Sequence, residues 1–308
     1  MRALFARLAG AAIFVLSALA CTEETAKSPA SADGGTTKGP SSSSGSTSSG
    51  SPPDATVPPR EIFVDVSNET MEFGGKTRSY VLGKPKNYNA NKAYPLVLSF
   101  HGSPGAATAQ AAGLPFDSVS KAAAVIVYPQ AATENWELYA PNETNPDMGW
   151  IHALPDEIAT KANIDKSKIF GFGYSGGGFF LAQFTCRFGD VFKAISINAG
   201  GAPHEPEMGY GKHDNGCYQC PGGPVATIVT HGAADPEVEP GSGEFAKTCF
   251  ATFNGCGDTL SDTTPAPCQQ VDGCPADKPV KWCLIPGQGH GPWAQAMTEA
   301  WSFFSAVP

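Results

Sequence analysis

The segment that decides the fold reads Lys168-Ile169-Phe170-Gly171-Phe172-Gly173-Tyr174-Ser175-Gly176-Gly177-Gly178. It starts as a short apolar run, which predicts a strand, and a stretch of helical composition follows it, residues 177–188. Residues 173–177 fit G-x-S-x-G, the pattern of a nucleophile elbow, in which a strand turns sharply into a helix. Glycines flank the serine because side chains there would collide with the strand and the helix. The pattern therefore predicts an exposed nucleophile, Ser175.

The same glycines fit two other interpretations. Their spacing, Gly171-x-Gly173-x-x-Gly176, matches the dinucleotide-binding fingerprint. That interpretation is disfavoured because the unit lies mid-chain and residues 194–196, about 20 positions on, offer no carboxylate for a ribose. A glycine-rich turn with a purely structural role is the second alternative.

Apolar runs alternate with helical segments on both sides of this elbow. Strands are expected at residues 61–66, 78–82, 95–100, 124–128, 168–171, 192–198, 225–230 and 280–285. Helices are expected at residues 106–122, 177–188, 244–253 and 293–306. The central runs lack polar alternation, so they predict strands buried on both faces. The chain is therefore predicted to be α/β, with a mostly parallel sheet and helices on both faces.

A serine nucleophile needs a base, and the base needs an orienting carboxylate. In an elbow-type serine hydrolase these follow in the order Ser, Asp or Glu, His. Asp235 comes just after the strand at 225–230, and His290 lies in a Gly-rich loop after the strand at 280–285. The carboxyl ends of strands are where open α/β sheets build their sites. We therefore expect Asp235 to orient His290. A simple turn before Pro236 and an exposed loop histidine are the alternatives.

The oxyanion of an acyl-transfer intermediate would be held by backbone N–H groups. In this arrangement one donor is the residue after the nucleophile and another follows an earlier strand, which points to Gly176 and Ser103. His101 takes part in this hole or braces its loop by hydrogen bonding. The predicted chemistry requires no metal and no cofactor.

The first sixty residues predict export. Residues 8–20 form an uncharged run after Arg2 and Arg7, too short for a bilayer span of about 20 residues. The run ends in small residues before Cys21, like a bacterial lipoprotein box, so residues 1–21 are predicted to be a signal with Cys21 lipidated. An ordinary secreted protein cut nearby is the alternative. Residues 22–60, rich in Ser, Thr, Gly and Pro, are predicted to be a disordered tether, and residues 61–308 one domain.

Composition excludes several other classes of protein. With 41% hydrophobic residues the chain can form a core, and a net charge of −9 without a basic stripe argues against nucleic-acid binding. The nine cysteines are many for a cytosolic protein. Without Cys21, the remaining eight suffice for four disulfides. A zinc or redox site at His213, Cys217 and Cys220 is the alternative.

The chain resembles the esterase family of polyhydroxybutyrate depolymerase-like proteins, feruloyl esterases and acetylxylan esterases. The matching segments are residues 95–103, 147–156 with 164–165, 171–178, 198–201, 231–235, 254–256 and 287–290. The resemblance extends over about residues 78–305 and implies an α/β-hydrolase fold. It also implies that Ser175, Asp235 and His290 are the nucleophile, acid and base. The departures are the residue after the serine, Pro155 in a usually helical stretch, and the extra cysteines.

By the same resemblance the chain would be a secreted or lipid-anchored esterase. Its substrates would be feruloyl or acetyl esters of plant polysaccharide, or short hydroxyalkanoate polyesters. The resemblance also pairs Cys256 with Cys274, and the other cysteines are expected to staple the loops of the acid and the base. Trp136 and Trp150 either line a subsite or pack in the core. A monomer is expected; a peptidase and a non-catalytic binding lipoprotein are the competing functions.

Overall fold

The computed structural model describes residues 60–204 and 209–308. The predicted signal, Cys21 and the predicted tether up to residue 59 lie outside the described residues. Among those that are described, no helix combines the length and the apolar character that a membrane crossing requires.

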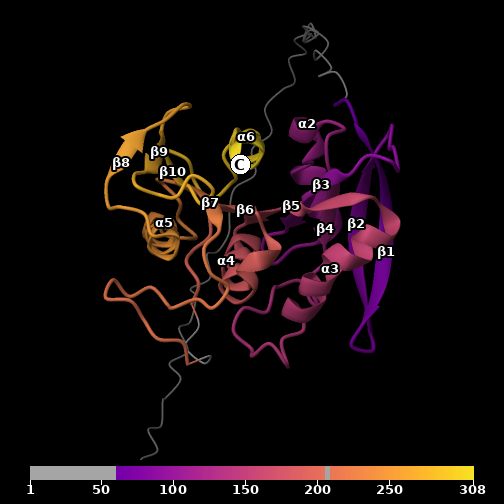
Figure 1. Cartoon of the computed structure of the whole chain (residues 1–308), viewed down its shortest axis with the longest axis horizontal. Helices are drawn as coiled ribbons and strands as arrows, with labels where there is room; N and C mark the ends of the chain where they lie inside the picture. Colours follow the sequence, from indigo (N-terminus) through magenta and orange to yellow (C-terminus); the bar gives the residue numbers. More distant parts are fainter. Residues whose placement is uncertain (1–59, 205–208) are drawn as a thin grey trace, which may run out of the picture. The chain divides into compact units, whose positions relative to one another are not determined.

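The described residues contain a ten-stranded sheet in the order β1-β2-β4-β3-β5-β6-β7-β10-β9-β8 (Figure 1). The strands are β1 Val64–Phe73, β2 Lys76–Pro85, β3 Tyr94–Phe100, β4 Val125–Pro129, β5 Ile164–Tyr174, β6 Ala194–Asn198, β7 Ala226–Gly232, β8 Leu260–Asp262, β9 Cys268–Val271 and β10 Val280–Ile285. The six central strands, from β4 to β10, pair in parallel. The two strands at each edge pair antiparallel. The predicted mostly parallel sheet is confirmed.

Strand order reverses between β3 and β5. From β3 the chain crosses to β4 on one side, and β5 then pairs with the other side of β3. In open α/β sheets ligands bind at such a switch point, beyond the carboxyl ends of the strands. Ser103 follows β3 and Ser175 follows β5, so the topology brings both predicted site residues to this point.

Helices cover both faces of the sheet. They are α1 Ala107–Gly113, α2 Asp117–Ser120, α3 Met148–Lys161, α4 Gly176–Phe188, α5 Pro240–Asn254 and α6 Ala296–Ala306. Figure 1 shows α2 and α6 on one side of the sheet and α3, α4 and α5 on the other. Successive residues of a strand point to opposite faces of the sheet and so pack into two hydrophobic cores. Leu96 and Leu98 of β3 lie in the core that contains residues of α3, α4 and α5, and Val97 lies in the core that contains residues of α6.

Two expected elements differ most in the structure, and helix α3 was not among the expected helices. The single helix expected at 106–122 is two short helices, because Leu114 precedes Pro115, which disfavours helical geometry in the residue before it. The first strand begins at Val64 and forms a ten-residue hairpin arm with β2, whereas residues 61–66 were expected. Helix α3 accommodates Pro155 in its interior. The sequence reasoning also missed β8 and β9.

Four disulfides account for the eight cysteines of the described domain: Cys186–Cys220, Cys217–Cys249, Cys256–Cys274 and Cys268–Cys283. The pair implied by resemblance, Cys256–Cys274, is confirmed. The zinc or redox alternative is wrong, because Cys217 and Cys220 are each bonded to another cysteine. The expected role needs correction, since no half-cystine lies in the loop of Asp235 or of His290. Two bridges reach elements next to these loops, through Cys249 in α5 and Cys283 in β10.

Candidate active site

Ser175 occupies a strained turn between β5 and α4. Its backbone angles, φ 50° and ψ −120°, are unusual for a residue with a side chain, and it caps the N-terminus of α4. Its N–H donates to the Asn198 carbonyl at 2.8 Å, which fixes the turn against β6. A Cβ on Gly173 would collide with the Gly177 carbonyl, and one on Gly177 with the strand end at Phe100. The glycines are therefore needed for close approach, as the sequence predicted.

The structure brings the three predicted triad residues together. His290 Nε2 lies 2.9 Å from Ser175 Oγ, and His290 Nδ1 lies 2.9 Å from Asp235 Oδ2. A carboxylate only accepts, so Nδ1 carries the proton and Nε2 is left to accept from the serine hydroxyl. The side chain of Asp235 is fully buried and that of His290 is 12% exposed. The arrangement can remove a proton from Ser175 and stabilise the imidazolium that results.

The surroundings of Asp235 favour its charged form. Burial alone raises the pKa of the carboxyl, but hydrogen bonds from the Val238 N–H, from His290 and from the Glu237 N–H outweigh it and lower the pKa below the ordinary value of 3.8. The two N–H groups reach Oδ1, at 3.0 Å and 2.9 Å. The second oxygen is thus left for the histidine.

Sequence reasoning missed three residues that contact His290 or Asp235. The Tyr174 hydroxyl donates to the His290 carbonyl at 2.9 Å. A carboxylate oxygen of Glu237 lies 3.9 Å from His290 Nε2, and His231 Nε2 lies 3.3 Å from Asp235 Oδ2. The only sign of these residues in the sequence is their position near the predicted triad. Tyr174 immediately precedes the serine, and His231 and Glu237 lie within four residues of Asp235.

Ser103 and Gly176 lie side by side, as the predicted oxyanion hole requires. A Cβ on Gly176 would fall 2.9 Å from the backbone nitrogen of Ser103 and would overlap its hydroxyl. Both residues are at the switch point, and Gly176 begins α4, where the positive end of the helix dipole adds to the N–H groups.

His101 braces the loop that carries Ser103. Its Nε2 accepts the Ala131 N–H at 3.2 Å, so Nδ1 carries the proton and donates to the Gly102 carbonyl at 2.7 Å. The Trp136 indole donates to the His101 carbonyl at 2.9 Å. Burial lowers the pKa of His101, and the neutral ring is the form that can accept from Ala131. The bracing alternative is the one that these contacts support.

Asp147 holds the segment of residues 132–137, which packs against the His101 loop. Its side chain accepts N–H groups from Ala132 at 2.7 Å and Glu137 at 2.9 Å. Burial raises the pKa of Asp147, although those hydrogen bonds lower it in part. Trp136 and Trp150 are 5% and 0% exposed and belong to the main core. Of the two roles expected for these tryptophans, packing in the core is confirmed.

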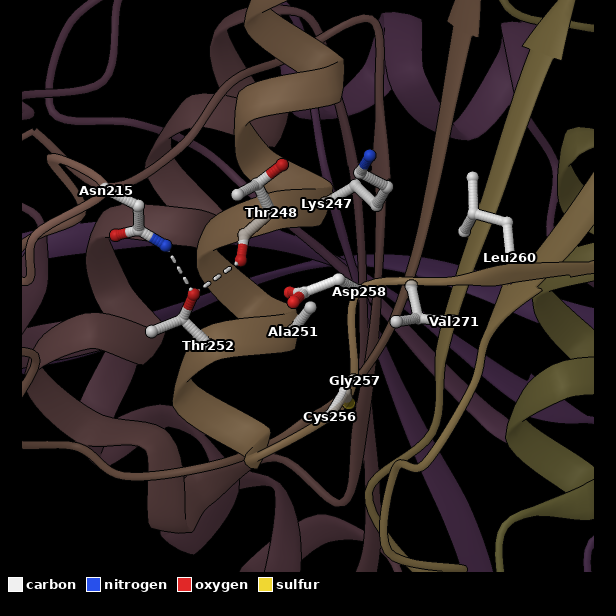
Figure 2. Close-up of a pocket in the computed structure, with 10 residues that line it drawn as sticks. All are labelled: Asn215, Lys247, Thr248, Ala251, Thr252, Cys256, Gly257, Asp258, Leu260 and Val271. Carbon is white, nitrogen blue, oxygen red and sulfur yellow. Dashed lines mark hydrogen bonds between the residues drawn. The ribbon is translucent and has the colours of Figure 1, made fainter.

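A separate pocket of about 110 Å³ lies between α5 and the β8–β9 segment (Figure 2). The Thr252 hydroxyl on its wall accepts from the Asn215 amide at 2.7 Å and donates to the Thr248 carbonyl at 2.9 Å. None of the candidate site residues lines this pocket. Within residues 60–204 and 209–308, no cluster of three or more His, Cys, Asp or Glu side chains is arranged to hold a metal ion.

Comparison with known proteins identifies relatives over much of the domain. No protein-family model matches the chain. It is 28% identical over 185 residues to Probable feruloyl esterase C of Aspergillus flavus, covering 58% of this chain and 63% of the relative. It thus spans just under two thirds of that relative's length. Identity to Feruloyl esterase D of Neurospora crassa is 25% over 264 residues, covering 77% of this chain and 84% of the relative.

A solved structure shares the fold. Acetyl xylan esterase from Aspergillus awamori superposes with a TM-score of 0.64 at 14% identity, covering 78% of this chain and 99% of that structure. The chain has the α/β-hydrolase fold, and its sequence is similar to those of feruloyl esterases.

Proposed function

We propose that this protein is a serine esterase that hydrolyses carboxylic esters through Ser175, His290 and Asp235. The observation that carries the proposal is the continuous hydrogen-bond chain from Asp235 Oδ2 through the His290 ring to Ser175 Oγ, with 2.9 Å at each step. A chain of this kind activates a hydroxyl that is otherwise a weak nucleophile at neutral pH.

The proposed reaction has two halves. Ser175 Oγ attacks the ester carbonyl while His290 Nε2 takes its proton, and the N–H groups of Gly176 and Ser103 hold the oxyanion. His290 then returns the proton to the leaving alcohol, which leaves an acyl group on Ser175. Water then attacks the acyl carbonyl while His290 Nε2 takes a proton from it. His290 gives this proton to Ser175 Oγ as the acyl bond breaks, and a carboxylic acid is released.

The substrate class is proposed from the relatives' names. Two relatives are named feruloyl esterases and a structural neighbour is an acetyl xylan esterase. We therefore propose feruloyl or acetyl esters of plant polysaccharide, with short hydroxyalkanoate polyesters as the other ester class. The four disulfides agree with an oxidising extracellular compartment. Attachment through Cys21 to a bacterial membrane is a further proposal, which rests on the sequence alone.

The test is hydrolysis of p-nitrophenyl acetate by the purified protein and by Ser175→Ala. We expect the variant to retain its fold by circular dichroism and to lose activity by about 10³-fold or more. Equal rates would exclude Ser175 as the nucleophile. The corresponding p-nitroanilide separates an esterase from a peptidase, because an esterase leaves the amide intact. Methyl ferulate, acetylated xylan and a hydroxybutyrate oligomer then rank the acyl groups.

A further inference from the structure

One buried histidine beside the triad has no part in the proposed reaction. His231 ends the buried face of β7, is 2% exposed, and precedes Asp235 by four residues. A buried polar side chain needs its hydrogen bonds satisfied, so the contacts of this ring indicate what it does.

The Nε2 atom of His231 closes the Asp235 loop. It donates to the Val238 carbonyl at 2.9 Å, and since a carbonyl only accepts, Nε2 carries the proton. The N–H of the same residue, Val238, donates to Asp235 Oδ1 at 3.0 Å. Nε2 also lies 3.3 Å from Asp235 Oδ2, the oxygen that accepts from His290. His231 therefore contacts the loop at two points that fix the Asp235 carboxylate.

The opposite edge of the ring lies on helix α5. A Cβ on Gly243 would collide with His231 Nδ1, so only glycine leaves room for the ring in its present position. Within the described residues Nδ1 has no hydrogen-bond partner. The ring is therefore placed by its Nε2 contacts on one edge and by the α5 backbone on the other.

We propose that His231 is a positioning residue for Asp235, and that the absence of a side chain at Gly243 of α5 lets the His231 ring take its position. This inference rests on the proposed function. Asp235 acts by holding the His290 ring in one tautomer and one orientation. A shift of about 1 Å in a catalytic constellation can cost about 100-fold in rate, so the contacts of His231 affect catalysis without touching the substrate.

The first test compares two substitutions of the histidine. His231→Leu removes the donor, and we expect kcat to fall about 10- to 100-fold with KM changed less than about twofold. His231→Gln places an amide N–H at similar reach, and we expect it to restore most of the loss. A purely structural histidine would instead give two variants that differ in melting temperature and share the wild-type kcat below the melting transition.

The second test uses two glycines on the same turn of α5. A Cβ on Gly243 meets the His231 ring, whereas a Cβ on Gly241 has nothing within 4 Å. Both substitutions to alanine raise helix propensity by about 1 kcal/mol, so they are matched in their local effect. We expect Gly243→Ala to lower kcat about tenfold and Gly241→Ala to leave it unchanged.

The outcomes separate this inference from the proposed function. Loss of activity in Ser175→Ala together with wild-type kcat in Gly243→Ala and in His231→Leu overturns the positioning role and retains the esterase. Full activity in Ser175→Ala overturns the proposed function itself. If His231→Leu does not fold, the two glycine variants provide the test. Equal kcat in Gly243→Ala and Gly241→Ala would contradict the proposal that contact between α5 and the His231 ring affects catalysis.

Discussion

The hydroxyl of Tyr174 donates a hydrogen bond to the backbone carbonyl of His290 at 2.9 Å. Tyr174, which precedes the proposed nucleophile Ser175, thus anchors the backbone of His290, the proposed base. Burial raises the pKa of Tyr174, and the nearby carboxylates of Glu237 and Asp235 raise it further. The phenol therefore stays protonated, and remains a donor, at any pH well below its ordinary pKa of 10.0.

We expect Tyr174→Phe to lower kcat about 5- to 10-fold with little change in KM. The substitution removes one hydrogen bond, worth about 1 kcal/mol, and frees the His290 loop to move. Steady-state kinetics on p-nitrophenyl acetate measure the effect, and a melting curve controls for stability. An unchanged kcat would show that the Gly-rich loop is held by its other contacts, such as the Gln288 amide on the Gly291 carbonyl at 3.0 Å.

The contact of Gly176 with Ser103 predicts which part of Ser103 matters. A Cβ on Gly176 would overlap the Ser103 side chain and fall 2.9 Å from its backbone nitrogen. Gly176→Ala should therefore displace a proposed oxyanion donor and reduce kcat about 10²- to 10³-fold. Ser103→Ala should retain most activity, because the proposed donor is the N–H. A severe loss in Ser103→Ala would assign the role to the hydroxyl instead.

His101 predicts a pH dependence of stability. Because its pKa is lowered by burial, the folded protein binds this proton less readily than the unfolded chain does. The stability that His101 contributes is therefore present above the ordinary value of 6.5 and is lost as the pH falls through the lowered pKa. Protonated Nε2 would also face the Ala131 N–H that it now accepts.

The test compares denaturant unfolding of wild type and His101→Gln at neutral pH and at steps below pH 6.5. Glutamine can still accept from Ala131 but does not titrate. We expect the wild type to lose more of its free energy of unfolding over this interval than the variant does. Parallel curves would mean that His101 makes no contribution to the acid sensitivity.

The chain order of the site was predictable because each residue follows a strand. Apolar runs marked the strands that end before Ser175, Asp235 and His290, and glycine spacing marked the elbow. Strand β10 matches its predicted bounds, Val280–Ile285. The contacts of His231 and Tyr174 were not predictable, because they depend on side-chain directions at the ends of β5, β7 and β10, which a linear pattern does not contain.

The edge strands β8 and β9 escaped prediction for another reason. All three residues of β8 are exposed, so the strand has no apolar alternation to detect. Strand β9 is four residues long, and Cys268 pairs in register with Cys283 of β10, to which it is also disulfide-bonded. A disulfide connectivity cannot be derived from spacing alone, and this part of the sheet depends on one.

The disulfide between Cys217 and Cys249 is expected to stabilise the domain substantially. It closes a loop over a sequence separation of 32 and joins the segment after β6 to α5. Loop-closure entropy predicts that the double variant Cys217→Ala/Cys249→Ala loses about 3 to 4 kcal/mol of unfolding free energy. Guanidinium unfolding measures it. A loss below about 1 kcal/mol would show that the unfolded chain is little constrained by this bridge.

Glu237 predicts how the product leaves. Its carboxylate lies 3.9 Å from His290 Nε2 and is 70% exposed, so it places a negative charge at the mouth of the proposed site. Ester hydrolysis releases a carboxylate, which this charge repels. At distances of about 4 Å in water the repulsion amounts to about 1 kcal/mol, and it weakens with added salt.

We therefore expect Glu237→Gln to strengthen inhibition by acetate about fivefold at low ionic strength, and less at high ionic strength. Glu239→Gln is the matched control, since it removes the same charge two residues away, where no contact with His290 is made by the exposed side chain. Inhibition constants for acetate in the three proteins test the expectation. Equal changes in both variants would assign the effect to net charge, and no change in either would mean that the carboxylate product does not pass Glu237 on leaving.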